Sequence, residues 1–480
     1  MIEEIPKSTV YALGAVGIAC IIAFSFWKWR TAVKIAFVAV LFEGAIRKWV
    51  LPQASELVYF LKDIFLIGAY LRFFLFPEQS LRFMRVKAPI IAFIVSSALI
   101  CLFAINPNIN SAIVALYGLK IYLFYVPLAF LMPYLFRSEE ECIRQASFYM
   151  LFAIPICLLG VAQFFSPAFS VLNTSDMAGG VENVIQFAGS GGTARARISG
   201  TFSFITNFGS FLQIFTVLGL ACLSAKEARF RWIIVFVILP LLVANAMMSG
   251  SRAAVAIQII SIMAFIFGSF FMRIGTAKNA AFISIMAFCI IGAVLVNAFS
   301  EAVDAFETRT RTTDEGPLER LSMIWTPLPD AYERAGLTGL GIGLTHPASE
   351  AVRRVLNQPE PIKPVFVYDA ELPQVIMELG ALGFIIWYGM RLMAFLGTMK
   401  NFFECPPRPI RSFLFAALLV HGMGLVVSVV LNHTFHFYYW ALYGLSLMPG
   451  RYSTAFVRRT NRPSNAATTS QLPVRSSHRP

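Results

Sequence analysis

Several charged side chains stand at the ends of long apolar runs, where a charge is costly and therefore suggests a function. Arg197 and Arg252 each lie beside the start of such a run, Arg320 lies in an acidic segment, and Asp369 closely precedes a further run. A guanidinium keeps its proton and pairs through its planar fork with phosphate oxygens. The three arginines are therefore functional candidates.

The carboxylates near the later apolar run are functional candidates as well. Asp369, with an ordinary pKa of about 3.9, is ionised at neutral pH and could take a proton from a hydroxyl group. Glu371 and Glu378 are rivals for this role, and with His433 they are candidates for substrate contact. A simpler alternative for Asp369 is that it only caps the helix that follows it.

Structural alternatives exist for the arginines as well. Arg252 could cap the outer end of a helix and reach lipid headgroups. Arg320 could pair with Glu319 or Asp314 in a solvated loop. Arg197 could be one of the basic residues that commonly flank a membrane span.

Membrane helices must position these residues. Hydrophobic residues make up 58% of the 480 residues and charged residues 14%, against about 25% charged in ordinary soluble domains. Runs of about 18 apolar residues, enough to cross a hydrocarbon core about 30 Å thick, recur along the chain. We expect 12 or 13 spans, near residues 9–26, 32–50, 57–76, 88–105, 112–136, 146–165, 201–224, 232–248, 253–272, 279–298, 373–397, 411–431 and 437–449. The predicted fold is an all-α polytopic membrane protein with a large extracytoplasmic loop of short helices.

Lysine and arginine are distributed unevenly between the connections, and this bias predicts orientation. The connections 77–87, 225–231 and 391–411 are basic, whereas 299–372 holds 12 of the 26 acidic residues. We therefore expect residues 1–450 to form one transmembrane domain, with loops 166–200 and 299–372 outside the cytoplasm.

The segment 451–480 contains six arginines and no acidic residue, and it predicts a disordered, basic, cytoplasmic tail. A nucleic-acid partner would need basic residues on a folded face with aromatic residues among them, and none is expected. The seven cysteines avoid both outward loops, so no disulfide is expected there.

Four short motifs in order resemble the O-antigen ligase and O-antigen polymerase superfamily of bacterial surface-polysaccharide assembly. They are Arg197-Ile-Ser-Gly-Thr-Phe, Ser251-Arg252-Ala-Ala, Arg320-(x)4-Trp325 followed by Gly339-Leu-Gly341, and Glu378-Leu-Gly380-Ala-Leu-Gly383. The segment from Glu43 to Pro52, with Lys62 and Asp63, is similar to one found in a subgroup of the same superfamily. Asp369 and Ala370 stand where the ligases carry His and Asn, which favours a polymerase or another relative.

The resemblance implies a metal-independent glycosyltransferase without a cofactor, in the bacterial inner membrane. Its donor would be a polyprenyl-diphosphate-linked glycan, and its acceptor a hydroxyl of a glycan or of the lipid A core. Arg252 and Arg320 would act on the diphosphate with Arg197 as a third cation, and Asp369 would be the base. Membrane lipids would surround the protein.

Three other patterns have simpler explanations. The stretch 336–343 is glycine-rich but lacks the strand that a dinucleotide fingerprint requires, so it predicts a turn where backbone passes close to helices. His433 and His436 have the spacing of metal ligands, yet no third ligand is nearby, and no metal site is expected. A secondary transporter is the alternative function, although no internal repeat supports it.

Overall fold

The computed structural model describes residues 7–76, 88–168, 170–173, 187–188, 195–274 and 324–451, with isolated positions between 285 and 322. Apart from a small antiparallel pair, β1 (Phe187–Ala188) with β2 (Arg195–Ala196), its regular structure is helical. The apolar helices confirm the predicted class, an all-α polytopic membrane protein. The expected tail after residue 451 lies outside the described residues.

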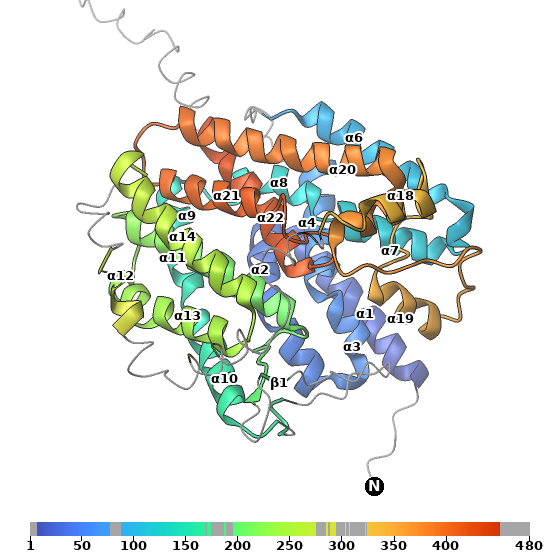
Figure 1. Cartoon of the computed structure of the whole chain (residues 1–480), viewed down its shortest axis with the longest axis horizontal. Helices are drawn as coiled ribbons and strands as arrows, with labels where there is room; N and C mark the ends of the chain where they lie inside the picture. The colour runs from blue at the N-terminus through green and yellow to red at the C-terminus, as the bar shows by residue number, and fades with distance from the viewer. Residues whose placement is uncertain are drawn as a thin grey trace, which may run out of the picture.

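Several neighbouring helices are joined by single π or 3-10 turns. Figure 1 shows how the helices are arranged. The first part of the chain comprises α1 (Lys7–Trp27), α2 (Trp29–Ala45), η1 (Ile46–Val50), η2 (Pro52–Ala54), α3 (Ser55–Tyr59), α4 (Leu61–Tyr70), η3 (Leu71–Leu75), α6 (Ile90–Leu102), η4 (Phe103–Ile105), η5 (Pro107–Ile109), α7 (Ala112–Leu123), α8 (Val126–Leu131), η6 (Met132–Tyr134), α9 (Glu139–Met150) and α10 (Ala153–Phe165). The second part comprises α11 (Ile205–Ser224), α12 (Arg231–Ile233), η7 (Ile234–Ile238), α13 (Leu239–Met248), α14 (Arg252–Phe271), α18 (Leu328–Ala335), α19 (Pro347–Val355), α20 (Glu371–Glu404), α21 (Arg411–Met423) and α22 (His433–Ser446).

Within the described part of the chain, six helical segments are long and apolar enough to cross a membrane. They are Ala112–Tyr134, Glu139–Phe165, Ile205–Ser224, Arg231–Met248, Arg252–Phe271 and Glu371–Glu404, and shorter apolar helices cover Gly14–Trp27, Ile90–Ile105 and Arg411–Met423. The predicted span 279–298 falls largely outside the described residues, so the total of 12 or 13 remains a prediction. The acidic loop contains the short helices α18 and α19, as expected.

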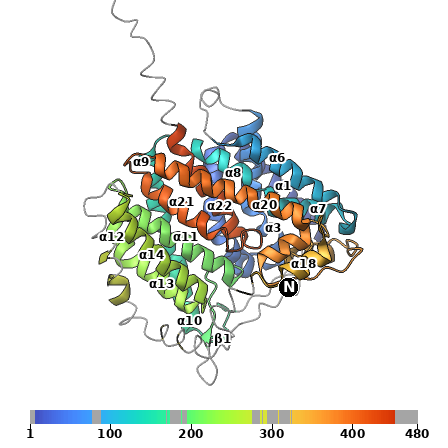
Figure 2. The same ribbon diagram turned by 45° about the horizontal axis from the view of Figure 1, so that its top comes forward.

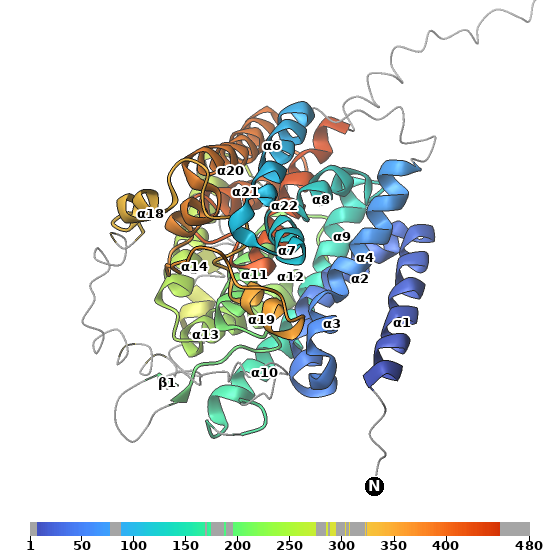
Figure 3. The ribbon, with the colours of Figure 1, turned by 90° about the vertical axis from the view of Figure 1, so that its right-hand side faces the viewer.

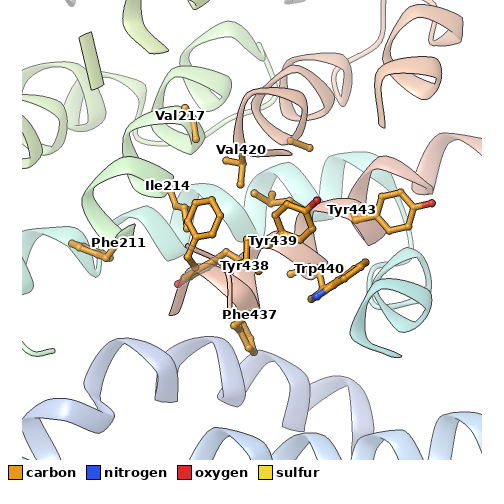
Figure 4. Close-up of a cluster of buried hydrophobic side chains, with 14 of the residues drawn as sticks. Phe211, Ile214, Val217, Val420, Phe437, Tyr438, Tyr439, Trp440 and Tyr443 are labelled. Carbon is orange, nitrogen blue, oxygen red and sulfur yellow. The ribbon is translucent and has the colours of Figure 1, made fainter. Parts of the chain in front are cut away.

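Helix α22 runs through the middle of the bundle and carries a run of aromatic residues (Figure 2). Tyr438 and Tyr439 are buried against α11 and α21, whose side chains Ile214 and Val420 face them in Figure 4. On the opposite side, the rings of Phe437 and Phe37 of α2 are 4.8 Å apart. Close packing of this kind holds helices together in lipid, where the hydrophobic effect gives little attraction between them.

Helix α20 is interrupted at Gly380, whose φ of 66° and ψ of −175° are not helical. The glycine-rich turn lies against this break, and two amides of the turn, those of Leu340 and Gly341, donate to the carbonyls of Met377 and Glu378 at 2.8 and 3.0 Å. A side chain on Gly339 would meet the Glu378 carbonyl oxygen at 2.3 Å. The predicted close passage of backbone at residues 336–343 is therefore confirmed. Such a break is tolerated in a membrane helix because other protein groups satisfy the freed backbone.

The two ends of the described chain lie at opposite ends of the molecule. The start of α1 lies at the same end as β1 and the end of α10, whereas the chain leaves α22 at the other end (Figure 3). A chain that crosses the membrane an odd number of times has its two ends on opposite sides. The placement of these two ends therefore favours 13 spans over 12.

Candidate functional site

Charged and aromatic side chains from six elements meet around the ring of Tyr59 in α3. The ammonium groups of Lys62 and Lys120 lie 4.9 and 4.5 Å from the ring centroid, and the guanidinium of Arg47 lies 5.2 Å away. The hydroxyl of Tyr117 donates to that of Tyr59 at 3.4 Å. We call this set the Tyr59 cluster; its members are Glu43, Arg47, Tyr59, Lys62, Asp63, Tyr117, Lys120 and His433.

Two ion pairs form the base of the cluster, and both come from consecutive residues of α4. Successive residues of a helix point in different directions, so Lys62 reaches Glu43 of α2 at 2.8 Å while Asp63 reaches Lys120 of α7 at 3.0 Å. Asp63 also accepts a hydrogen bond from Tyr125 at 2.7 Å. Removing these charges from water costs several kcal/mol for each ion, which the pairing offsets only in part.

His433 joins the cluster from the first turn of α22. Its Nε2 lies 3.0 Å from the Glu43 carboxylate, and its ring centroid lies 5.2 Å from that of Tyr59. Asn432 fixes this turn, because its side chain accepts from the Phe435 amide at 3.0 Å and donates to Ser210 of α11 at 2.8 Å. The imidazole is therefore held in place by its own helix and by its neighbours.

The stretch 197–203 runs beside the cluster and carries one of the predicted motifs. Arg197 donates to the Ser249 carbonyl at 2.9 Å, at the turn between α13 and α14. Further along the stretch, two serines accept from the basic pair of η1, with Lys48 to Ser199 at 2.7 Å and Arg47 to Ser203 at 3.0 Å. Three cations therefore contact this stretch or belong to it, namely Arg197, Arg47 and Lys48. Arg252 begins α14 three residues beyond Ser249.

The three residues predicted to be catalytic lie in different settings. Arg252 is the first residue of α14 and is half-buried, without a hydrogen bond or ion pair to any described residue. Asp369 is exposed and likewise has no such partner within the described ranges. It does not cap α20, because the residue before that helix is Ala370 and no side chain caps it. Arg320 lies outside the described residues.

Glu371, a candidate for substrate contact, is buried and fully engaged by protein groups. Its carboxylate pairs with the buried Arg391 and accepts hydrogen bonds from Tyr388 at 3.3 Å and from the Val430 amide at 2.5 Å. Arg391 also donates to the Val427 carbonyl at 3.2 Å. These contacts tie the segment between α21 and α22 to α20, and they leave this carboxylate little room for a substrate.

Glu378 is also buried, beside the break in α20. Its carboxylate accepts hydrogen bonds from the Tyr122 hydroxyl at 2.7 Å and from the Thr345 amide and hydroxyl at 2.9 and 2.6 Å. No lysine or arginine in the described part of the chain pairs with it. The Tyr122 hydroxyl belongs to α7, and the two Thr345 donors lie just after the glycine-rich turn. These three hydrogen bonds therefore hold α7 and the end of the turn against α20.

His346 stands between the glycine-rich turn and the Tyr59 cluster, outside the membrane helices. Its Nδ1 accepts from the Ala348 amide at 3.1 Å and so caps α19, and its ring lies 5.9 Å from that of Tyr117. Burial, reinforced by the positive charges nearby, lowers the pKa of His346 to about 3. The residue is thus neutral at neutral pH. Among the described residues, no group of three or more His, Cys, Asp or Glu side chains is arranged to hold a metal ion.

No protein-family model and no curated protein matches the chain. The site therefore has to be judged on its own geometry.

The segment from Glu43 to Pro52, with Lys62 and Asp63, stands out in the sequence but has no predicted role, and Lys120 and Tyr59 are not among the predicted site residues. The available signal was the presence of charges within apolar spans, which is a sign of function in membranes.

Proposed function

We propose that the protein is a glycosyltransferase of the bacterial inner membrane. It transfers a glycan from a polyprenyl diphosphate to a hydroxyl of a glycan or of the lipid A core, as O-antigen ligases and polymerases do. The supporting observation is that Arg47 and Lys48 bind serines of the stretch 197–203. Arg197 of the same stretch binds the turn that precedes Arg252. The Lys and Arg bias of the loops predicts that this site faces outward.

Each part of this arrangement has a task in the reaction. A diphosphate leaving group gains negative charge as the glycosidic bond breaks, and fixed cations stabilise that charge without reorganising. Lys48 is nearly buried and has no acidic partner among the described residues, and Arg252 has no partner there at all. Both cations are therefore available to an anionic ligand, while the hydrocarbon tail of the donor would stay in the bilayer.

A secondary transporter is the second candidate, and one observation favours it. Transporters often use interrupted helices near their substrate site, and α20 is interrupted at Gly380 beside the buried Glu378. A transporter would require substrate movement across the membrane, whereas the transferase requires only one open side.

The test is the surface glycan of a strain that lacks the gene, complemented with single variants. Arg252→Ala should abolish ligated or polymerised product while the protein remains in the membrane, and Arg252→Lys should restore it only in part because an ammonium cannot pair bidentately. Arg273→Ala is the matched control, because Arg273 is exposed just beyond the opposite end of α14. A wild-type glycan profile in the strain without the gene would refute the proposal, and solute uptake that depends on the gene would favour the transporter.

A further inference from the structure

A carboxylate and an imidazole form a hydrogen-bonded dyad at the edge of the Tyr59 cluster. The Nε2 of His433 is 3.0 Å from Oε1 of Glu43, and the ammonium of Lys62 binds both oxygens of the same carboxylate, at 2.9 and 2.8 Å. The three groups come from α22, α2 and α4, which are far apart in the sequence. His433 lies outside the four motifs that carry the sequence resemblance, and Glu43 and Lys62 belong to the segment that is similar to a subgroup of the superfamily.

The charges of this dyad determine where its proton lies. Glu43 is engaged by an ammonium and therefore acts as an acceptor, so Nε2 of His433 is the nitrogen that donates to it. Nδ1 then carries the free lone pair. The amide nitrogen of Asn207 lies 3.5 Å from Nδ1 and 3.4 Å from Nε2, and a hydroxyl group of a substrate can replace this long contact at Nδ1. Because Lys62 already balances the charge of Glu43, the imidazole can remain neutral.

The position of His433 suits a reacting group better than that of Asp369. The His433 side chain is 13% exposed, so it is held by its neighbours yet remains reachable. It shares Tyr59 as a neighbour with Arg47, one of the cations proposed to bind the diphosphate. Asp369 is exposed, and nothing in the described part of the chain orients it.

We propose that His433 is the general base of the glycosyl transfer and that Glu43 is the residue that positions it. This inference rests on the proposed function. Nδ1 of His433 takes the proton of the acceptor hydroxyl as its oxygen forms a bond to the anomeric carbon of the donor. The bond between that carbon and the diphosphate oxygen breaks, and the polyprenyl diphosphate leaves with the electron pair. The imidazolium, stabilised by Glu43, then releases its proton to water.

The experiment compares two candidate bases in the same complemented strain and in membranes prepared from it. His433→Gln keeps a hydrogen-bond donor for Glu43 but removes the base, so we expect turnover to fall by roughly 10²–10⁴-fold. Cross-linking to a polyprenyl diphosphate that carries a photoreactive group should persist in this variant. Asp369→Asn should retain most of the activity.

Chemical rescue separates catalysis from a structural role. Adding imidazole to membranes that contain His433→Ala should restore measurable transfer, because the added base can occupy the vacated space. It cannot repair a misfolded bundle. Three outcomes would each overturn the role of His433. The first is full activity of His433→Gln, and the second is absence of rescue in a His433→Ala protein that still binds the cross-linker. The third is loss of turnover in Asp369→Asn alone. In those cases the wild-type protein still makes product and the proposed function stands, whereas absence of product from the wild-type protein overturns both.

Discussion

Replacing Gly380 with alanine tests whether the interruption of α20 is built into the fold. A Cβ at this position would lie 2.3 Å from the Leu337 carbonyl oxygen and 2.4 Å from the Gly339 amide nitrogen. Both atoms belong to backbone, which cannot rotate away as the end of a side chain can. The backbone angles of Gly380, φ 66° and ψ −175°, also lie in a region that is essentially reserved for glycine.

These two effects add to a large destabilisation. The strained backbone costs about 1–3 kcal/mol and the forced overpacking about 1–3 kcal/mol more. Gly389→Ala, further along α20, is the matched control, because nothing lies within 4 Å of its added Cβ. In a helical position alanine is favoured over glycine by about 1 kcal/mol. The two variants should therefore differ by about 3 kcal/mol or more in the free energy of unfolding.

Detergent-solubilised protein provides the assay. The fraction of each variant that remains monodisperse after heating should fall at a clearly lower temperature for Gly380→Ala than for the wild-type protein, while Gly389→Ala should match or exceed the wild-type protein. The reasoning fails if Gly380→Ala is as stable as Gly389→Ala, since the turn at residues 336–341 would then not depend on a break in α20.

Three further predictions follow from other parts of the molecule. Gly44→Ala should weaken the contact of α2 with the stretch 197–203 and reduce product, because its Cβ would lie 2.4 Å from the Thr201 carbonyl oxygen, whereas Gly17→Ala has open space and should be silent. Lowering the pH from about 6.5 towards 3 should loosen α19, because unfolded His346 binds a proton that the buried folded residue excludes. The loosening is measured as a loss of amide protection, with the exchange rate at each pH divided by the intrinsic rate at that pH. His346→Asn should keep the cap and lose this dependence, and equal exchange of both proteins at low pH would disprove it. Topology reporters at the N-terminus and after Arg459 should report opposite sides of the membrane, and the same side would refute 13 spans.

Sequence alone predicted the all-α membrane class because long apolar runs have few alternatives in a membrane. The number of spans stays a prediction. The glycine-rich turn was also predictable, since the spacing of Gly339, Gly341 and Gly343 without a preceding strand excluded a nucleotide loop. What could not be predicted was the partner of each charge. Glu371 and Glu378 lie seven residues apart on one helix, yet one pairs with Arg391 and the other accepts only neutral donors. These partners come from distant segments, which a pattern along the chain does not reveal.

The candidate base illustrates the same difficulty. Asp369 stands where the ligases of the similar superfamily carry a histidine, and its role as the base stays a prediction. His433 is hundreds of residues from Glu43 in the sequence, and only the packing of α22 against α2 brings them within 3.0 Å. His436 lies one turn beyond His433 on the same side of α22, and the two rings have different neighbours: His433 packs against Tyr59, and His436 packs against Tyr125 and Trp387.

The free-energy cost of burying ion pairs is a reason to propose the Tyr59 cluster, and not an exposed carboxylate, as the functional site. Replacing a buried ion pair with apolar side chains of similar volume is often neutral or stabilising, so stability alone does not call for the Glu43–Lys62 and Asp63–Lys120 pairs. What these pairs do provide is a fixed field: Lys62 balances Glu43, Glu43 orients His433, and Asp63 holds Lys120 beside Tyr59. A reaction that moves a proton and builds up charge on a diphosphate benefits from such a field, because groups already in place need not reorganise as the charge develops.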